Sequence, residues 1–189
     1  MSIDNITAAK LETVAHMLDG RVAKPKSELG ISAQGYVLGF PCRLEALNPN
    51  WPFGVNYFVD TEVITSPNPN RESFSLDIIP RVGKGILGFF ARLLIFEASG
   101  MKVGDKELDK EFICTFTKRH LVERFLRYPG VSENLLKLHK YSSFNELKIE
   151  SNAGLYLSQP VAFSRLDLDN CRETFTLMGE VAQVLYEAF

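Results

Sequence analysis

Four acidic residues near the middle of the chain are spaced in a way that could bind a metal ion. A carboxylate stands at every second position of this run: Asp105, Glu107, Asp109 and Glu111. The spacing resembles the first half of a calcium-binding loop, in which alternate residues supply oxygen ligands. Such a loop needs Gly at its sixth position and Glu at its twelfth, where this chain has Lys110 and Phe116. The stronger interpretation is a turn after Gly104 that Asp105 closes, so no metal or other cofactor is predicted.

Other carboxylates could take part in acid and base chemistry. Three of them fall in segments that have the pattern of strands: Asp60, Glu62 and Asp77. Adjacent strands could bring two such groups within reach of one substrate. An enzyme hypothesis joins these residues with Asp105 and Asp109 and uses the loop around Trp51 as a lid, with or without a bound metal. The sequence does not show such a meeting, so no catalytic residue is assigned.

The histidines and cysteines do not form a recognisable site. They are scattered along the chain: His16, Cys42, Cys114, His120, His139 and Cys171. No histidine has a second ligand at zinc-binding spacing, and no nucleophile elbow or phosphate-binding glycine loop is present. Cys114 is expected on a strand among aromatic residues, where burial would keep its thiol inert. An odd number of cysteines without a CxxC pair indicates reduced thiols in a cytoplasmic protein.

Two groups of aromatic residues could contact a ligand or a partner. Trp51 and Phe53 lie in a loop rich in Pro and Asn, where they would either stack on a ligand or fold back over the core. Phe89, Phe90 and Arg92 belong to the most hydrophobic segment, 85–98. As a helix this segment would resemble an amphipathic anchor for a membrane surface or a partner. Its apolar residues spread nearly all round, however, which favours burial in the core.

The run from Lys84 to Leu126 resembles uncharacterised bacterial proteins grouped as domains of unknown function. The shared pattern is Gly-Asp, a few residues, Phe-Asp, two residues and Phe, and it is matched here by Gly104, Asp105, Asp109 and Phe112. Leu108 stands where the pattern prefers Phe. The resemblance covers about a quarter of the chain well and the C-terminal third loosely. It implies a related fold and no activity.

Composition limits the class of protein. With 189 residues, of which 46% are hydrophobic, the chain can bury a substantial core. A net charge of −2 and a pI near 6.0 argue against a nucleic-acid partner, which a basic surface would favour. No apolar run reaches the roughly 18 to 20 residues of a membrane-spanning helix, and no signal peptide opens the chain. We therefore expect a cytoplasmic protein, for which peripheral membrane contact remains open.

The hydrophobic pattern predicts an α+β fold. A single domain, 1–189, is expected, with two lobes at 1–99 and 100–189 as an alternative. The pattern predicts about six strands in one or two antiparallel sheets, packed against an N-terminal helix, a central helical pair and a long C-terminal helix. The expected strands cover 35–46, 55–63, 74–78, 112–117 and a hairpin at 147–157; the expected helices cover 2–19, 118–127, 131–139 and 167–189.

Three features of these elements bear on how they pack. The first three strands are joined by loops rich in Pro and Asn and are expected to form an antiparallel meander. The segment from Arg21 to Leu29 is expected to be a basic connector. The last helix carries an apolar seam of three heptads, from Leu168 to Phe189. This seam would dock across the sheet or form a homodimer, and docking is the favoured interpretation.

These features favour a non-catalytic binding or assembly module of the bacterial cytoplasm. The partner would be another protein or a second copy of the chain, and the candidate contact residues are the aromatic groups and the acidic turn. An enzyme with a carboxylate site is the alternative. A peripheral membrane protein that binds through Phe89, Phe90 and Arg92 is a weaker third hypothesis.

Overall fold

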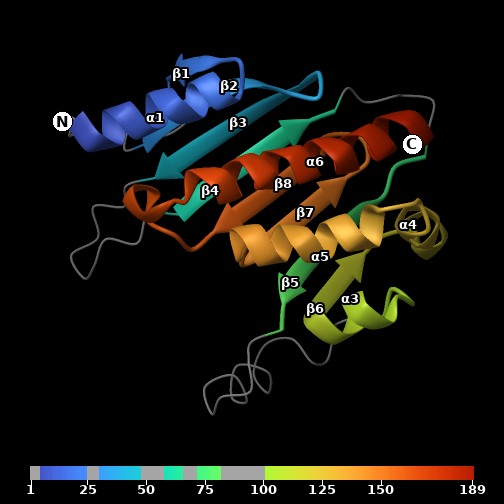
Figure 1. Cartoon of the computed structure of the whole chain (residues 1–189). Helices are drawn as coiled ribbons and strands as arrows, with labels where there is room; N and C mark the ends of the chain where they lie inside the picture. The colour runs from blue at the N-terminus through green and yellow to red at the C-terminus, as the bar shows by residue number, and fades with distance from the viewer. Residues whose placement is uncertain (1–4, 25–29, 48–57, 66–71, 82–100) are drawn as a thin grey trace, which may run out of the picture.

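The protein is an α+β structure with one eight-stranded antiparallel sheet. The computed structural model describes residues 5–24, 30–47, 58–65, 72–81 and 101–189. Helices α1, α5 and α6 lie across one face of the sheet (Figure 1). The strands are β1 (Arg21–Ala23), β2 (Gly30–Val37), β3 (Phe40–Leu47), β4 (Phe58–Ile64), β5 (Ser75–Pro80), β6 (Phe112–Phe116), β7 (Glu146–Glu150) and β8 (Gly154–Gln159). The helices are α1 (Asn5–Met17), α3 (Lys106–Glu111), α4 (Arg119–Leu126), α5 (Val131–Ser142), the 3-10 helix η2 (Phe163–Arg165) and α6 (Leu168–Ala188).

The prediction of about six strands is wrong, because the first half of the sheet contains two more. Arg21–Ala23, expected as part of a connector, pairs with β2 as a short edge strand. The segment expected as one strand from residue 35 to 46 is a hairpin of β2 and β3 that turns at Leu38 and Gly39. Both turn residues have positive φ, 48° and 84°, as a two-residue hairpin turn requires. Leu is uncommon at such a position, and the alternating apolar pattern therefore concealed the turn.

The order of the strands is β1-β2-β3-β4-β8-β7-β5-β6. The hairpin of β7 and β8 fits between β4 and β5, so these two strands are not neighbours. The expected meander of the first three strands is therefore wrong at its last step. Local spacing predicts strands but carries no information on which distant strand completes the ladder.

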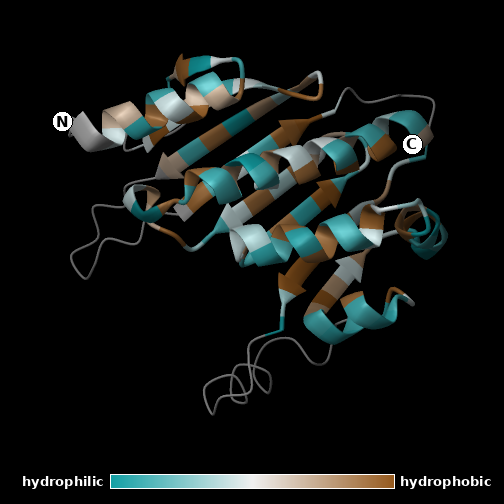
Figure 2. Cartoon of the chain, in the orientation of Figure 1, coloured by the Kyte–Doolittle hydropathy of each residue, from teal (hydrophilic) through white to brown (hydrophobic). Residues whose placement is uncertain are grey.

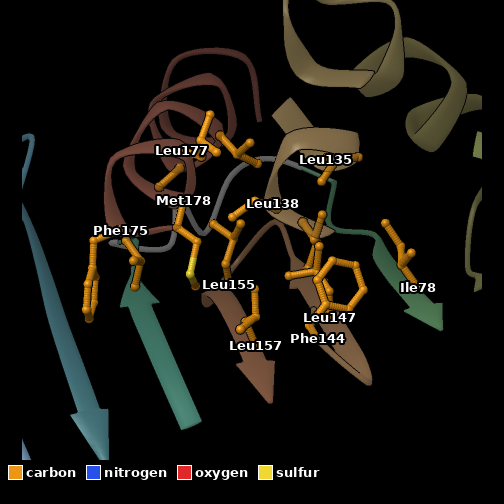
Figure 3. Close-up of a cluster of buried hydrophobic side chains, with 14 of the residues drawn as sticks. Ile78, Leu135, Leu138, Phe144, Leu147, Leu155, Leu157, Phe175, Leu177 and Met178 are labelled. Atoms are coloured by element: carbon orange, nitrogen blue, oxygen red, sulfur yellow. The ribbon is translucent and has the colours of Figure 1, made fainter. Parts of the chain in front are cut away.

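The core lies between the sheet and the helices. Figure 2 shows hydrophobic residues on the strands beneath the helices and hydrophilic residues on the outer sides of α5 and α6. The seam of α6 is buried within the chain, as the docking interpretation predicted. Side chains from α5, α6 and the sheet meet in Figure 3, among them Leu135, Leu138, Leu147, Leu155, Leu157, Phe175 and Met178.

The elements of the second half agree with the sequence patterns in most details. Phe112 and Cys114 of β6 are buried, and α4 buries the predicted face: Leu121, Val122, Phe125 and Leu126. Asp167, one of two predicted caps, accepts a hydrogen bond from the Asn170 amide at the start of α6. The predicted cap of α5 is wrong. Gly130 occupies the cap position, and the Ser132 hydroxyl donates to the Leu126 carbonyl.

Helix α1 is tied to the opposite end of the chain by one lysine. The apolar residues predicted to face the core are buried: Leu11, Val14 and Ala15 on the helix and Leu18 directly after it. The Lys10 ammonium donates to the carbonyl oxygens of Ser164 at 2.9 Å, Leu166 at 2.8 Å and Phe163 at 3.4 Å. These carbonyls belong to η2 and the residue after it, so Lys10 joins α1 to the connection between β8 and α6.

We expect Lys10→Met to lower the free energy of unfolding by about 1 to 3 kcal/mol, because hydrogen bonds from a charged donor contribute this much. The methionine keeps the aliphatic stem and removes the donor. Urea unfolding followed by circular dichroism measures the change. Lys106→Met, an exposed lysine on α3, is the control and should change stability by less than about 0.5 kcal/mol. Equal effects of the two substitutions would contradict a stabilising role for the Lys10 hydrogen bonds.

Among the described residues, no helix is both long enough and apolar enough to cross a membrane.

Candidate functional site

The acidic turn folds the chain and does not form an open ligand site. Asp105 is the N-cap of α3, and its carboxylate accepts from the amides of Glu107 and Leu108 at 3.0 and 3.1 Å. Asp109 accepts from the amides of Val103 at 2.8 Å and Gly104 at 3.2 Å. The interpretation that Asp105 closes a turn agrees with these bonds, although the turn opens into a short helix.

Five of the candidate contact residues lie outside the described part of the chain: Trp51, Phe53, Phe89, Phe90 and Arg92. The ligand platform, the lid and the membrane anchor therefore remain predictions.

The strand carboxylates share one face of the sheet without converging. Asp60 and Glu62 lie on β4 and Asp77 lies on β5, with β8 and β7 between them. At the roughly 4.8 Å spacing of neighbouring strands, Asp77 is about three strand spacings from β4. Within the part of the chain that the structure describes, no three His, Cys, Asp or Glu side chains are grouped to hold a metal ion.

The sheet face opposite the helices is organised as a row, with one side chain from each strand. Cross-strand pairing places these residues side by side in the order Arg21, Gln34, Arg43, Glu62, Tyr156, Lys148, Asp77 and Thr115. We call this surface the polar face and this set of residues the polar row. All of its members except Arg21 are partly buried, so the row is a packed layer of side chains.

A hollow of about 660 Å³ opens at the β1 to β4 end of the polar face. Arg21, Gln34, Arg43 and Glu62 line its polar part, and Tyr36 and Ile64 line its less polar part. Tyr36 is 60% exposed and Ile64 is 43% exposed. A smaller hollow of about 140 Å³ shares Glu62 and is also lined by Lys148 and Tyr156. The polar face thus offers charged, aromatic and aliphatic groups side by side.

Two carboxylates stand opposite each other beside the row. Glu45 and Asp60 are directly paired across β3 and β4, an arrangement that is unfavourable for like charges. The Arg43 guanidinium lies 3.6 Å from the Glu45 carboxylate and donates to the Ser32 hydroxyl at 2.9 Å. These contacts offset part of the repulsion and fix the Arg43 side chain.

Tyr156, at the centre of the sheet, is held as a neutral phenol. Burial, reinforced by the charge of the Asp60 carboxylate and a hydrogen bond with it, raises the pKa of Tyr156 to about 12. One oxygen of Asp60 is buried and has no hydrogen-bond partner among the described residues. Tyr156 is therefore a hydrogen-bonding and packing group at neutral pH, because ionisation would place a second negative charge beside Asp60.

The three thiols are buried and unsuited to nucleophilic chemistry. Cys42, Cys114 and Cys171 are free cysteines. Burial raises the pKa of each thiol to about 12, so the thiolate is rare at neutral pH. The inert character predicted for Cys114 agrees with this pKa.

His139 is a titratable group inside the core layer. Its ring lies 5.3 Å from the Phe112 ring and 5.0 Å from the Phe144 ring, centroid to centroid. Burial lowers the pKa of His139 below its ordinary value of 6.5, and the charge of Glu111 opposes this shift. Its Nδ1 atom is buried without a hydrogen-bond partner in the described part of the chain. The neutral ring is the form that the fold accommodates.

We expect stability to fall as the pH is lowered from about 6.5, the unfolded pKa, through the lower folded pKa of His139. The unfolded chain takes up the proton first, so acid favours unfolding, whereas above pH 6.5 the contribution is fully present. His139→Phe should flatten this part of the curve of unfolding free energy against pH, measured by urea unfolding. His16→Gln, at an exposed histidine, should retain the slope of the wild type. A slope that is unchanged in His139→Phe would exclude His139 as its source.

Comparison of the chain with protein-family models, with curated proteins and with solved structures gives no match. The resemblance to bacterial domains of unknown function stays a prediction.

Sequence reasoning singled out only Glu62 and Asp77 of the polar row. It missed the other six members: Arg21, Gln34, Arg43, Tyr156, Lys148 and Thr115. Each stands among other polar residues of its own strand or connector and carries no motif, and only the strand order brings them together. The alternation itself was the available signal, because it predicted a polar face for each strand without showing which strands adjoin.

Proposed function

We propose that the chain is a non-catalytic binding or assembly module and that the polar face is its contact surface. The observation that carries the proposal is the polar row itself: partly buried charged and aromatic side chains run from strand to strand on the sheet face opposite the helices. Arg and Tyr are enriched at protein interfaces, and side chains held in place lose less entropy on binding than free ones. The exposed Tyr36 and Ile64 at one end of the row add apolar area.

The observed roles of the acidic residues support the binding module over the enzyme alternative. The carboxylates of Asp105 and Asp109 accept hydrogen bonds from backbone amides. Asp77 is separated from Asp60 by two intervening strands. The membrane alternative depends on residues outside the described part of the chain and stays a prediction. A bacterial cytoplasmic location is likewise an expectation from the cysteine pattern.

A pair of equally exposed tyrosines on opposite sides of the molecule offers a matched test. Tyr36 on the polar face is 60% exposed, and Tyr186 on α6 is 59% exposed. A photoreactive benzoylphenylalanine placed at either position would be irradiated in living bacterial cells that make the protein. The proposal predicts discrete larger species for position 36 and none for position 186. Absence of a product at position 36, or the same products at both positions, would overturn it.

A further inference from the structure

The charges of the polar row are reversed on the two sides of Tyr156. One strand away from Tyr156 stand Glu62 on β4 and Lys148 on β7. Two strands away stand Arg43 on β3 and Asp77 on β5. These two charged positions on one side of the central strand therefore have opposite charges at the equivalent positions on the other side. The next pair outward, Gln34 and Thr115, is uncharged and polar.

A row with this pattern of charges is complementary to itself. We infer that the polar face binds a second copy of the chain, with a two-fold axis that runs along β8 between the two sheets; this inference rests on the proposed function. Rotation about such an axis exchanges the two sides of the row. Glu62 of one copy then faces Lys148 of the other, Arg43 faces Asp77, and the two Tyr156 rings meet on the axis. An isologous interface has this reciprocity, because each contact occurs twice.

The charges distinguish this arrangement from the other face-to-face one. If the axis ran across the strands, each residue of the row would face its own copy, and Arg43 would meet Arg43. Like charges brought together in an interface weaken it, and this axis would do so at every charged position of the row. The axis along β8 does so only beside the row, where Asp60 of one copy faces Glu146 of the other. With the axis along β8 the strands of the two sheets are aligned, which is a common packing of sheets at about 10 Å separation. Lys, Arg and Glu side chains are long enough to meet across that gap.

The contacts inside one chain leave Lys148 accessible to a second partner and hold Arg43 more firmly. The Lys148 ammonium lies 3.2 Å from the carboxylate of Glu146 on its own strand, and its side chain is 44% exposed. The Arg43 side chain is 19% exposed; it is paired with Glu45 at 3.6 Å and also donates to the Lys24 carbonyl at 2.7 Å. A facing carboxylate would add to the pair of Lys148 without breaking it, and it would meet only the exposed part of the Arg43 guanidinium. Five strands at about 4.8 Å spacing form a patch roughly 20 Å wide, so we expect a small interface with a micromolar dissociation constant.

Charge reversal with complementation tests the inference. Glu62→Lys makes both facing positions basic, and Lys148→Glu makes both acidic, so each variant alone should be monomeric, with a dissociation constant raised on the order of 100-fold. A one-to-one mixture places opposite charges at both contacts and should form a dimer again. The wild type and Lys140→Glu, an exposed control on α5, should remain dimeric. Sedimentation velocity gives the masses, and circular dichroism confirms folding.

Each outcome decides the inference. A monomeric wild type, single variants that stay dimeric, or folded monomers that do not combine on mixing would overturn it. If a variant does not fold, the salt dependence of the wild-type dimer is the test instead. The dimer should dissociate more readily as salt is raised, because exposed ion pairs are screened. A dimer that is insensitive to salt would contradict the inference. The wild type could be monomeric while position 36 forms a cross-link to a different protein. That result would support the proposed function and exclude a second copy of the chain as the partner.

Thiol cross-linking tests the orientation of the two-fold axis separately. Tyr156→Cys places a thiol on the two-fold axis, so a short bismaleimide should join the two copies of this variant. Asp77→Cys places the thiols away from the axis and should give little product with the same reagent. The native thiols are buried and give a low background. Equal products from the two variants would exclude the axis along β8.

Discussion

Gly35→Ala is expected to lower the free energy of unfolding by more than about 3 kcal/mol, because the chain passes too close for a side chain at this point. A Cβ built on Gly35 would overlap the Leu18 carbonyl oxygen and lie 2.7 Å from the Leu18 Cβ. The same carbonyl accepts a 2.7 Å hydrogen bond from the Tyr36 amide. Backbone on both sides must therefore move, and this costs more than the usual overpacking of a core.

The substitution would separate the end of α1 from β2 and disturb the short strand β1 that follows it. Urea unfolding of the wild type and Gly35→Ala measures the change at constant m-value. Gly39→Ala is the matched control. Gly39 has a φ of 84° but nothing within 4 Å of its Cβ position, so it should cost only about 1 to 2 kcal/mol, the strain of a left-handed residue. If Gly35→Ala costs no more than Gly39→Ala, the close approach is relieved by small movements.

The parts of the fold that could be predicted are those whose burial repeats locally. The seam of α6 recurs at threes and fours, and the face of α4 does the same, because each helix buries one side against the sheet. In β6, Phe112 and Cys114 alternate with residues of the other face. Such patterns need only neighbouring residues, so they are present in the sequence whatever the topology.

The strand order could not be predicted, because it depends on contacts between distant segments. β4 ends at residue 64 and pairs with β8, which begins at residue 154. The spacing of apolar residues in either strand does not identify the strand with which it pairs. The short edge strand β1 is similarly defined by pairing with β2, and its three residues carry no periodicity.

The candidate site also has one part that the local sequence predicts and one part that depends on contacts between distant segments. Asp105 could be identified as closing a turn, because one of the amides that it accepts from, that of Leu108, is only three residues away. The bonds of Asp109 to the amides of Val103 and Gly104 were not predicted. The polar row could not be identified, because it takes one residue from each of eight strands. Glu62 and Asp77 were noticed as carboxylates, but the opposite charges of Lys148 and Arg43 became meaningful only once β8 was placed between β4 and β7.

An aromatic cluster holds the far ends of three elements together. Phe74, before β5, lies 5.4 Å from Phe125 of α4 and 5.1 Å from Phe189 after α6, between ring centroids. The Arg124 guanidinium lies over the Phe189 ring at 4.3 Å and donates to the Ala188 carbonyl. Phe125 is fully buried. The cluster therefore joins one edge of the sheet to the helical layer.

Phe125→Ala is expected to destabilise the protein by about 3 to 5 kcal/mol, because it removes a buried ring and leaves a cavity between rings that cannot collapse together. Phe125→Leu keeps most of the volume and should cost less than about 1.5 kcal/mol. Both are measured by urea unfolding, with an unchanged m-value as the sign that the unfolded state is the same. A loss below about 1.5 kcal/mol for Phe125→Ala would mean that Phe74 and Phe189 repack into the space. The contact between α4 and the end of α6 would then be adaptable and would not hold the two elements at a fixed distance.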